Sequence, residues 1–451
     1  MRRLRLLWVT PNLPLRGVTA ARERWWSLLS RIARRHDVTL LAFVDAEDAA
    51  VDDGLPAGLA AVHRIVKRPW VPDDPLALLP STVRGGFSDP ALAAAVAERL
   101  AAEPFDVVQY EYTEMAHLMP RSPVPSILTV HQIGFAQEGP RWRADGRRPA
   151  EAPRALFRHL RDLDWELAAV RRANLVVTMS PEDAARLRAW LPDLRVAVSP
   201  VGVDCHELRP PATIPVPAVD LLFVGHFGHP PNVDAIRFLV DDVLPRIGRP
   251  VRLRIVGHAA PPVVQALARP GTVEIVGPVP DLRPALSAAR VVVAPVRFGT
   301  GMRSKVLEAL AMGRPVVTTT VGAEGLGADA GRHLLVADDA TAFAASIRRL
   351  LDDDALAARV GAAGRRLVEE RFDWDPIAAA HDAIYESALT APRPSGAAFD
   401  HDPRLARLVA RAGRAPALAA GALVVAGRAL SRHRAARQVR DASSPGGARP
   451  T

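Results

Sequence analysis

The stretch over residues 291–326 constrains the fold of this chain more than any other part of the sequence: VVVAPVRFGTGMRSKVLEALAMGRPVVTTTVGAEGL. It opens with a short β-branched run at 291–294, which is typical of a buried parallel strand. An amphipathic run with apolar residues at helical spacing follows at 302–312, and a second strand is expected at 316–319. The stretch therefore predicts a strand, a glycine-rich loop, a helix and a second parallel strand.

Glycines and a proline mark the ends of this predicted helix. Gly299 and Gly301 bracket the turn before it, Gly313 stands in the C-cap position, and Pro315 forbids its continuation. The helix N-terminus then lies at the carboxyl ends of the strands, where ligands bind in doubly wound sheets. Free backbone N–H groups at that place suit a phosphate.

The use of lysine singles out one position of this helix. Of the 58 basic residues only Lys67 and Lys305 are lysines, and the rest are arginines. Lys305 lies in the first turn of the predicted helix, three residues before Glu308, so the two side chains share a face. A compact ammonium suits a diphosphate, and a carboxylate suits the paired hydroxyls of a ribose. The spacing alone equally allows a surface ion pair on an ordinary helix.

Strand-like and helix-like runs alternate over residues 1–390. Strands are predicted at 4–9, 38–44, 62–66, 107–110, 127–130, 175–178 and 196–199, and then at 220–224, 251–256, 273–276, 291–294, 316–319 and 334–336. This order predicts an α/β protein with two doubly wound, Rossmann-like domains, each with a parallel sheet covered on both faces. The predicted division is an N-terminal domain at 1–205, a linker at 206–218, a C-terminal domain at 219–371, a helix at 372–390 and a basic and apolar tail at 391–451.

Three residues of the first half are candidates for a ligand site. His131 directly follows a predicted strand, so it lies at the rim of the ligand crevice, where an imidazole is able to donate to a sugar hydroxyl or a developing charge. A histidine that caps a turn is the alternative. Glu111 follows the strand at 107–110 and is a weaker candidate for the same rim. Gly17, near the start of the first helix, is a candidate for close approach of a phosphate or simply part of a turn.

The sequence GTGMRSKVLEALAMGRPVVTTTVGAEGL, residues 299–326, resembles the nucleotide-sugar signature of retaining GT-B glycosyltransferases, specifically glycosyltransferase family four of the group 1 type. The resemblance implies two Rossmann-like domains that face a central cleft, and a C-terminal helix that crosses back to the N-terminal domain. It implies that Glu308 holds the ribose of the donor. The residues that it assigns to the donor diphosphate are Gly299, Thr300, Gly301, Arg303 and Lys305.

The chain departs from the commonest family pattern in two places. That pattern has a glutamate where this chain has Thr300, although one branch of the family carries the G-T-G loop seen here. Many members carry an arginine and a lysine at 225–232, which this chain lacks, so their work falls to Arg303 and Lys305. The resemblance adds further donor contacts from Gly17, Gly225, Asn232 and Val279, and places His131 beside the transferred sugar as a catalytic residue together with Lys305 and Glu308.

These features imply an enzyme that moves a hexosyl or other glycosyl group from a nucleotide diphosphate to a glycan, lipid or small-molecule acceptor, with retention. No cofactor and no metal are expected, because His226, His229 and His258 lack the spacing of metal ligands. Two alternatives stay open: a nucleotide-sugar epimerase of the same fold, and a non-catalytic GT-B partner or scaffold subunit. An oxidoreductase is disfavoured, because no G-x-G-x-x-G follows the first strand of either half.

The charge of the chain is concentrated in its tail. The net charge is +9, and residues 396–451 hold ten arginines and three aspartates, which leaves +2 for the rest. Such a distribution disfavours a nucleic-acid partner. Within 404–440 a basic amphipathic run adjoins an apolar one, which fits either shallow membrane attachment or a disordered tail. With Cys205 as the lone cysteine, we expect a cytoplasmic protein, which is peripheral on the inner face of the membrane if the tail attaches there. The resemblance implies a part in polysaccharide or glycolipid synthesis.

Overall fold

The computed structural model divides the chain into two compact units. The first comprises residues 1–199 and 380–451, and the second comprises residues 200–379. The structure describes residues 2–68, 80, 83, 86–87, 89–136, 153–211, 218–258, 260–299 and 301–392. Thr300, the loop at 137–152, residues 212–217 of the predicted linker and the tail beyond residue 392 therefore lie outside the described residues, and with them the predicted membrane contact of 404–440.

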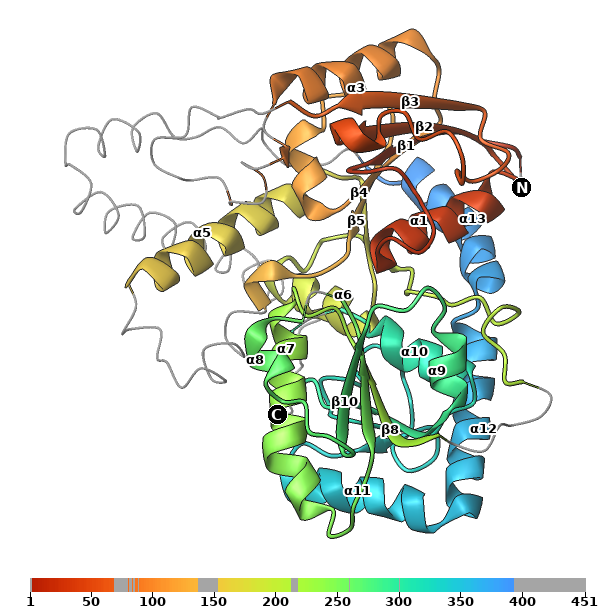
Figure 1. The fold of residues 1–451 in the computed structure, drawn as a ribbon. Coiled ribbons are helices and arrows are strands. Elements are labelled where there is room, and N and C mark those ends of the chain that lie inside the picture. Colours follow the sequence, from red (N-terminus) through yellow and green to blue (C-terminus); the bar gives the residue numbers. More distant parts are fainter. Residues whose placement is uncertain are drawn as a thin grey trace, which may run out of the picture. The chain divides into compact units, whose positions relative to one another are not determined.

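The first unit is built on a parallel sheet with the strand order β3-β2-β1-β4-β5-β6-β7 (Figure 1). Its strands are β1 (Arg5–Thr10), β2 (Asp37–Val44), β3 (Ala61–Val66), β4 (Val107–Glu111), β5 (Ser126–Val130), β6 (Leu175–Thr178) and β7 (Val196–Val198). Its helices are α1 (Ala20–Ile32), α3 (Pro90–Ala102), α5 (Pro153–Val170) and α6 (Pro181–Trp190), with short turns η1 (Ala46–Asp48) and η2 (Thr113–Leu118).

The second unit repeats this design with the order β10-β9-β8-β11-β12-β13, also parallel throughout. Its strands are β8 (Val219–Val224), β9 (Leu253–Val256), β10 (Val273–Gly277), β11 (Ala289–Ala294), β12 (Val316–Thr318) and β13 (Leu335–Val336). Its helices are α7 (Pro230–Arg237), α8 (Pro262–Gln265), α9 (Arg283–Ser287), α10 (Ser304–Ala311), α11 (Ala340–Asp352) and α12 (Asp354–Arg371), with a π-helix, η4 (Phe238–Val243), and a short 3-10 helix, η5 (Leu244–Arg246).

Alternate residues of the central strands of the second unit enter two separate cores. Leu221 of β8 and Val293 of β11 pack in a core with residues of α7, η4 and α11, whereas Leu222 and Val292 pack in a core with residues of α9, α10 and α12. Successive side chains of a strand point to opposite faces, so helices cover both faces of this sheet, as Figure 1 shows for α8 and α10. The predicted doubly wound α/β fold is confirmed, and every predicted strand overlaps an observed one.

The last described helix, α13 (Trp374–Leu389), begins in the second unit and belongs to the first from Ala380 onward. In the first unit it is held by buried polar groups, because the Tyr385 hydroxyl donates to Gln109 Oε1 (3.3 Å) and His36 contacts Asp382 (3.1 Å). The predicted return of the C-terminal helix to the first unit is therefore confirmed. Among the described residues, no helix combines the length and the hydropathy that crossing a bilayer requires.

Candidate active site

The strand order of the second unit reverses between β8 and β11, which is the topological switch point of its sheet. Two loops leave the carboxyl ends of these neighbouring strands: residues 225–229, which lead into α7, and residues 295–303, which lead into α10. Ligands bind at such a switch point in doubly wound sheets. The predicted donor-binding residues Gly225, Asn232, Gly299, Arg303 and Lys305 all lie on these loops or in the first turns of the two helices.

Lys305 is the central residue of this group. Its Nζ donates a hydrogen bond to Asn232 Oδ1 (2.5 Å) and lies 4.7 Å from the centroid of the Phe223 ring. Asn232 is fixed in turn, because its Nδ2 donates to the His226 carbonyl (2.8 Å). A side chain at Gly225 would place its Cβ 3.2 Å from the lysine Nζ, so a glycine here leaves room for the ammonium. Residues from three different segments therefore hold one amine at the switch point.

Positive charge accumulates around this amine. Burial first, and then the nearby guanidinium of Arg303, lower the pKa of Lys305 to about 7, against the opposing effect of the Glu308 carboxylate. The pKa of His229 is lowered as well, first by burial and then by Arg303, Lys305 and His226. Cations that depress one another's pKa values in a cleft mark a place where an anionic ligand would be stabilised.

The helix that carries Lys305 is positioned by its own sequence. Val306, Leu307 and Leu310 of α10 are fully buried on one face. The helix ends at Gly313 (φ +64°), whose N–H donates to the Leu310 carbonyl (2.9 Å) while Arg314 N–H donates to the Ala309 carbonyl (3.0 Å). These bonds form a Schellman motif, so the predicted C-cap is confirmed.

The N-terminal end of α10 is shaped by two glycines with positive φ, Gly299 (+110°) and Gly301 (+82°). Arg303 occupies the N-cap position without a side-chain capping bond and is largely buried, with 9% exposure. Glu308 lies one turn after Lys305 on α10 and is partly buried. Val279, which follows β10, packs against the core that contains the buried residues of α10. The loop therefore brings the end of a helix, a guanidinium and an ammonium to the switch point. We call Gly225, Asn232, Gly299, Arg303 and Lys305 the lysine crevice.

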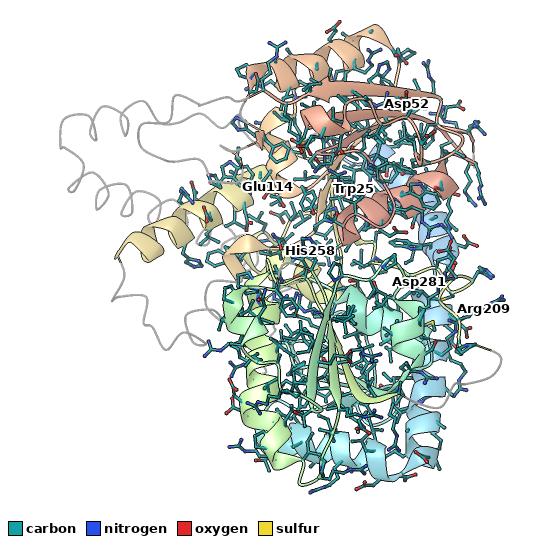
Figure 2. The ribbon with its side chains drawn as sticks, viewed as in Figure 1. Trp25, Asp52, Glu114, Arg209, His258 and Asp281 are labelled. Carbon is teal, nitrogen blue, oxygen red and sulfur yellow. The ribbon has the colours of Figure 1, made fainter. Side chains whose placement is uncertain are left out.

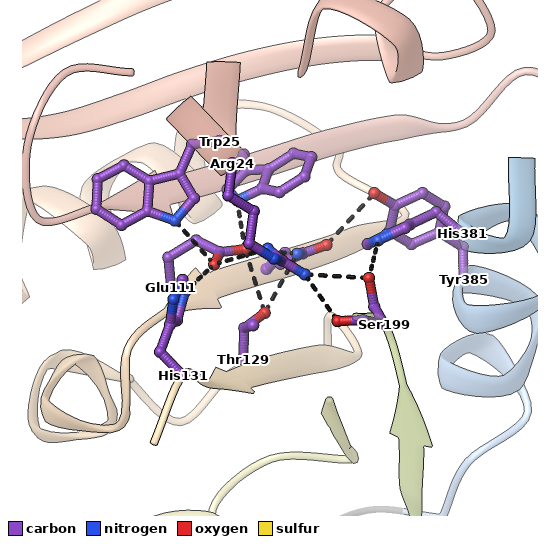
Figure 3. A network of polar contacts seen from close by, with 10 residues as sticks. Arg24, Trp25, Glu111, Thr129, His131, Ser199, His381 and Tyr385 are labelled. Atoms are coloured by element: carbon purple, nitrogen blue, oxygen red, sulfur yellow. Dashed lines mark hydrogen bonds and ion pairs between the residues drawn. The ribbon is translucent and has the colours of Figure 1, made fainter. Parts of the chain in front are cut away.

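The corresponding switch point of the first unit, between β1 and β4, is filled by the unit's own side chains. At its centre is Glu111, the last residue of β4, on which the dashed contacts of Figure 3 converge. Its side chain is 0% exposed. Its Oε1 accepts hydrogen bonds from Trp8 (3.0 Å), Gln109 (2.7 Å) and Thr129 (3.2 Å). Its Oε2 accepts from Trp25 (3.0 Å), Arg24 (3.5 Å) and His131 (2.7 Å). We call Glu111 and these six partners the carboxylate cluster.

The burial of Glu111 corrects one prediction. Burial by itself would raise the pKa of this carboxyl, but the hydrogen bond from His131 and the charge of Arg24 lower it to about 2. The group is a charged, fully enclosed acceptor, and Trp25, which belongs to the same cluster, also lies inside the first unit (Figure 2). Glu111 is enclosed and does not line the rim, so the prediction that it lies there is wrong.

Arg24 extends the carboxylate cluster to the place where the chain leaves the first unit. Its Nη2 donates to the hydroxyl (3.0 Å) and the carbonyl (3.3 Å) of Ser199, and the hydroxyl lies 3.0 Å from His381 Nε2. Ser199 is the last residue before the second unit, and His381 lies just after the chain returns. The sequence gives no local sign of this arrangement, because Glu111 is 87 positions from Arg24.

His131 is confirmed at the carboxyl end of β5, where its side chain keeps 11% exposure. Its ring stacks on Tyr112, with centroids 4.2 Å apart. Tyr112 has φ +80°, the only positive φ of a non-glycine residue among those described. Gly17 lies in the β1–α1 loop of the same unit, and its N–H donates to Glu23 Oε2 (3.0 Å). The predicted site residues thus fall into two groups, His131 and Gly17 in one unit and the lysine crevice in the other.

The histidines of the second unit do not assemble a metal centre in the described part of the chain. His226 and His258 stack with ring centroids 5.3 Å apart, and His258 is marked in Figure 2. Within the described ranges, no three His, Cys, Asp or Glu side chains converge as metal ligands would. The ligand of this unit is therefore sought at the cationic groups of the lysine crevice, which suit an anion.

Comparison with known proteins extends the resemblance to most of the described chain. Residues 23–207 match the family model described as Glycosyltransferase Family 4, and residues 218–353 match the one described as Glycosyl transferases group 1. The chain is 30% identical over 281 residues to the D-inositol 3-phosphate glycosyltransferase of Streptomyces avermitilis, an alignment that covers 55% of this chain and 58% of that protein. The chain spans about half the length, or less, of the curated relatives it matches.

Solved structures share the fold. Sucrose-phosphate synthase from Thermosynechococcus elongatus superposes with a TM-score of 0.65 at 20% identity, covering 85% of this chain and 98% of that one. HepE from Anabaena, solved in complex with UDP and glucose, superposes with a TM-score of 0.58 at 16% identity, covering 85% and 100%. Both family matches and both similarities of fold agree, and the chain belongs to the GT-B glycosyltransferases of group 1, the family 4 type.

Proposed function

We propose that this protein transfers a glycosyl group from a nucleotide diphosphate donor to a glycan, lipid or small-molecule acceptor, and that the lysine crevice of the second unit binds the donor diphosphate. The observation that carries the proposal is the amine of Lys305, held at the β8–β11 switch point by Asn232 beside the guanidinium of Arg303. A diphosphate is the common ligand that matches two adjacent cations and a helix N-terminus.

The chemistry follows from this charge arrangement. When the bond between the sugar and the diphosphate breaks, negative charge grows on the departing phosphate oxygen. Lys305 and Arg303 stabilise that charge in a partly enclosed site, where electrostatic interactions are stronger than in water. The same two side chains supply the positive charge that a metal supplies elsewhere, so the proposal requires no metal ion. Retention of configuration is part of the proposal and is supported by the likeness of 299–326 to retaining enzymes.

The rest of the donor is assigned by position. Glu308 lies one turn beyond Lys305 on α10 and acts on its pKa, so it is close enough to hold the ribose of a donor whose diphosphate contacts Lys305. Val279 follows β10, and we assign its loop to the nucleotide base. The complex of HepE with UDP and glucose supports a donor of this class. His131, on the first unit, is assigned to the transferred sugar.

Transfer is favoured over the two alternatives. The curated relative named above is a glycosyltransferase, which supports transfer over epimerisation. A scaffold subunit would not need a buried amine, because burying a cation without a ligand is unfavourable. A bound anion would offset the free-energy cost of burying the ammonium of Lys305.

The proposal is tested by thermal unfolding in the presence of nucleoside diphosphates and nucleotide sugars with different bases. A ligand that binds the folded state raises the unfolding midpoint by mass action. We expect nucleotides with one particular base to raise the unfolding midpoint, and we expect Glu308→Ala to remove most of that rise. Glu370→Ala, which alters an exposed glutamate on α12 of the same unit, is the matched control and should keep the full rise. No rise with any nucleotide would refute a donor site here.

A further inference from the structure

The carboxylate cluster determines which ring nitrogen of His131 carries the hydrogen. Six groups approach the two oxygens of Glu111, and the indole N–H groups of Trp8 and Trp25 and the guanidinium of Arg24 are obligate donors. Each oxygen therefore already accepts a hydrogen bond from a group that has no alternative. The carboxyl is ionised and has no proton of its own, in line with its pKa of about 2.

The contact with His131 follows from this count. His131 Nε2 lies 2.7 Å from Glu111 Oε2, a distance that requires a hydrogen between the two atoms. Because the carboxylate has none, the hydrogen is on Nε2. The ring is held in this orientation from the other side by Tyr112, which stacks on it at 4.2 Å and takes up a backbone conformation unusual for a residue with a side chain.

The charge balance of the cluster indicates that the imidazole is neutral. Glu111 and Arg24 already form a buried pair of opposite charges. The other titratable groups facing them are uncharged near neutral pH, because burial lowers the pKa of His381 to about 3 and raises the pKa of Tyr112 to about 12 and that of Tyr385 well above its usual range. A protonated His131 would leave a net buried positive charge, and burial lowers the pKa of His131 even though the hydrogen bond to Glu111 and its charge act in the opposite direction.

We propose that Glu111 is a positioning residue that holds His131 as the neutral tautomer protonated on Nε2, so that Nδ1 is offered to the substrate as the acceptor of a hydrogen bond from a sugar hydroxyl. Within the described residues no hydrogen bond is made to Nδ1. The direction of this contact is the reverse of the donating imidazole predicted from the sequence. The proposal rests on the proposed function, because the hydroxyl belongs to a sugar substrate.

The test is a spectroscopic one on the full chain, with ¹⁵N-labelled histidine and long-range ¹H–¹⁵N correlation of the imidazole rings. The His131 signals are identified by their absence in His131→Asn. We expect the pattern of the Nε2–H tautomer, unchanged between about pH 6 and pH 8. The Nδ1–H tautomer, or an imidazolium that titrates in this range, would overturn the proposal. Because no nucleotide is present, the result does not depend on whether the donor site is assigned correctly.

A variant separates the role of Glu111 from the intrinsic preference of the ring. In Glu111→Gln an amide nitrogen replaces one carboxylate oxygen. We expect the His131 spectrum of the folded variant to depart from the pattern of the Nε2–H tautomer. If it keeps that pattern, Glu111 does not set the tautomer and the proposal fails. Each oxygen of Glu111 accepts from an indole N–H, so the amide nitrogen of the glutamine would face one of these donors and destabilise the fold. If the variant does not fold, the spectrum of the unaltered protein tests the proposal. Thr129→Val, which removes one weaker donor to Glu111, is the matched control and should leave the pattern unchanged.

Discussion

Replacing Lys305 with methionine removes the ammonium that we assign to the donor diphosphate and keeps most of the length of the side chain. The lost group lies 2.5 Å from Asn232 Oδ1 and over the ring of Phe223, so an apolar stem remains above an apolar ring. A hydrogen bond to a charged group contributes about 1.5–3 kcal/mol. Each 1.4 kcal/mol is about a factor of ten, so we expect nucleotide-sugar affinity to fall about 10- to 150-fold, measured by isothermal titration calorimetry at about pH 6.5.

The sequence contains a matched control for this experiment, because its one other lysine, Lys67, is also bonded to an asparagine. Lys67 Nζ donates to Asn12 Oδ1 (3.1 Å) and pairs with Asp45 (3.2 Å) in the first unit. We expect Lys67→Met to bind the nucleotide sugar as the unaltered protein does. Unchanged affinity in Lys305→Met, or an equal loss in both variants, would refute the assignment of the diphosphate to Lys305.

The stability of Lys305→Met distinguishes loss of the ligand site from loss of the fold. Burial lowers the pKa of Lys305 from 10.5 to about 7, so the charged amine destabilises the folded state. This penalty is fully present below pH 7 and disappears as the pH rises to the unfolded value of 10.5. Methionine carries no such penalty. We therefore expect the variant to be at least as stable as the unaltered protein at about pH 7 in urea unfolding, even though its affinity is lower.

Three further predictions concern the lysine crevice and the carboxylate cluster. A bound diphosphate favours the charged amine of Lys305, whose pKa in the free protein is about 7, so nucleotide-sugar affinity should fall about fivefold from about pH 7 to pH 8 in calorimetric titrations; an affinity independent of pH would contradict this. Arg303→Lys keeps a cation at the N-cap of α10, so it should weaken donor binding by less than tenfold and by less than Lys305→Met does, and a larger loss would show that the planar guanidinium is required. Glu111→Ala leaves the guanidinium of Arg24 buried without its carboxylate, and should cost about 3–5 kcal/mol of unfolding free energy in urea; a cost below about 1 kcal/mol would be incompatible with the carboxylate cluster.

The fold and the lysine crevice could be predicted because their signals are local. Parallel strands buried on both faces are continuous β-branched runs, and each predicted run overlaps an observed strand. Gly313 and Pro315 marked the end of α10 for the same reason, since a left-handed C-cap and a missing N–H are properties of single residues. Lys305 was identified by its rarity, although its pairing with Asn232, 73 positions away, is visible only in the structure.

The carboxylate cluster could not be predicted because its members come from separate strands and helices. Trp8, Arg24 and Trp25 read as ordinary members of β1 and α1, and they meet Glu111 only when β1 and β4 become neighbours in the sheet. A residue after a strand points either to the rim or into the unit, and the sequence does not say which. Glu111 was assigned to the rim for this reason and is instead fully enclosed, whereas the side chain of His131, in the same kind of position, keeps 11% exposure.

The central claim is that the crevice between β8 and β11 holds the diphosphate of a nucleotide sugar. The most direct measurement is a crystal structure of the protein with the nucleotide that raises its unfolding midpoint. The account predicts phosphate oxygens within about 3.2 Å of Lys305 Nζ and of the Arg303 guanidinium, with the ribose hydroxyls on Glu308. A nucleotide bound elsewhere, with Lys305 still bonded only to Asn232, would contradict it.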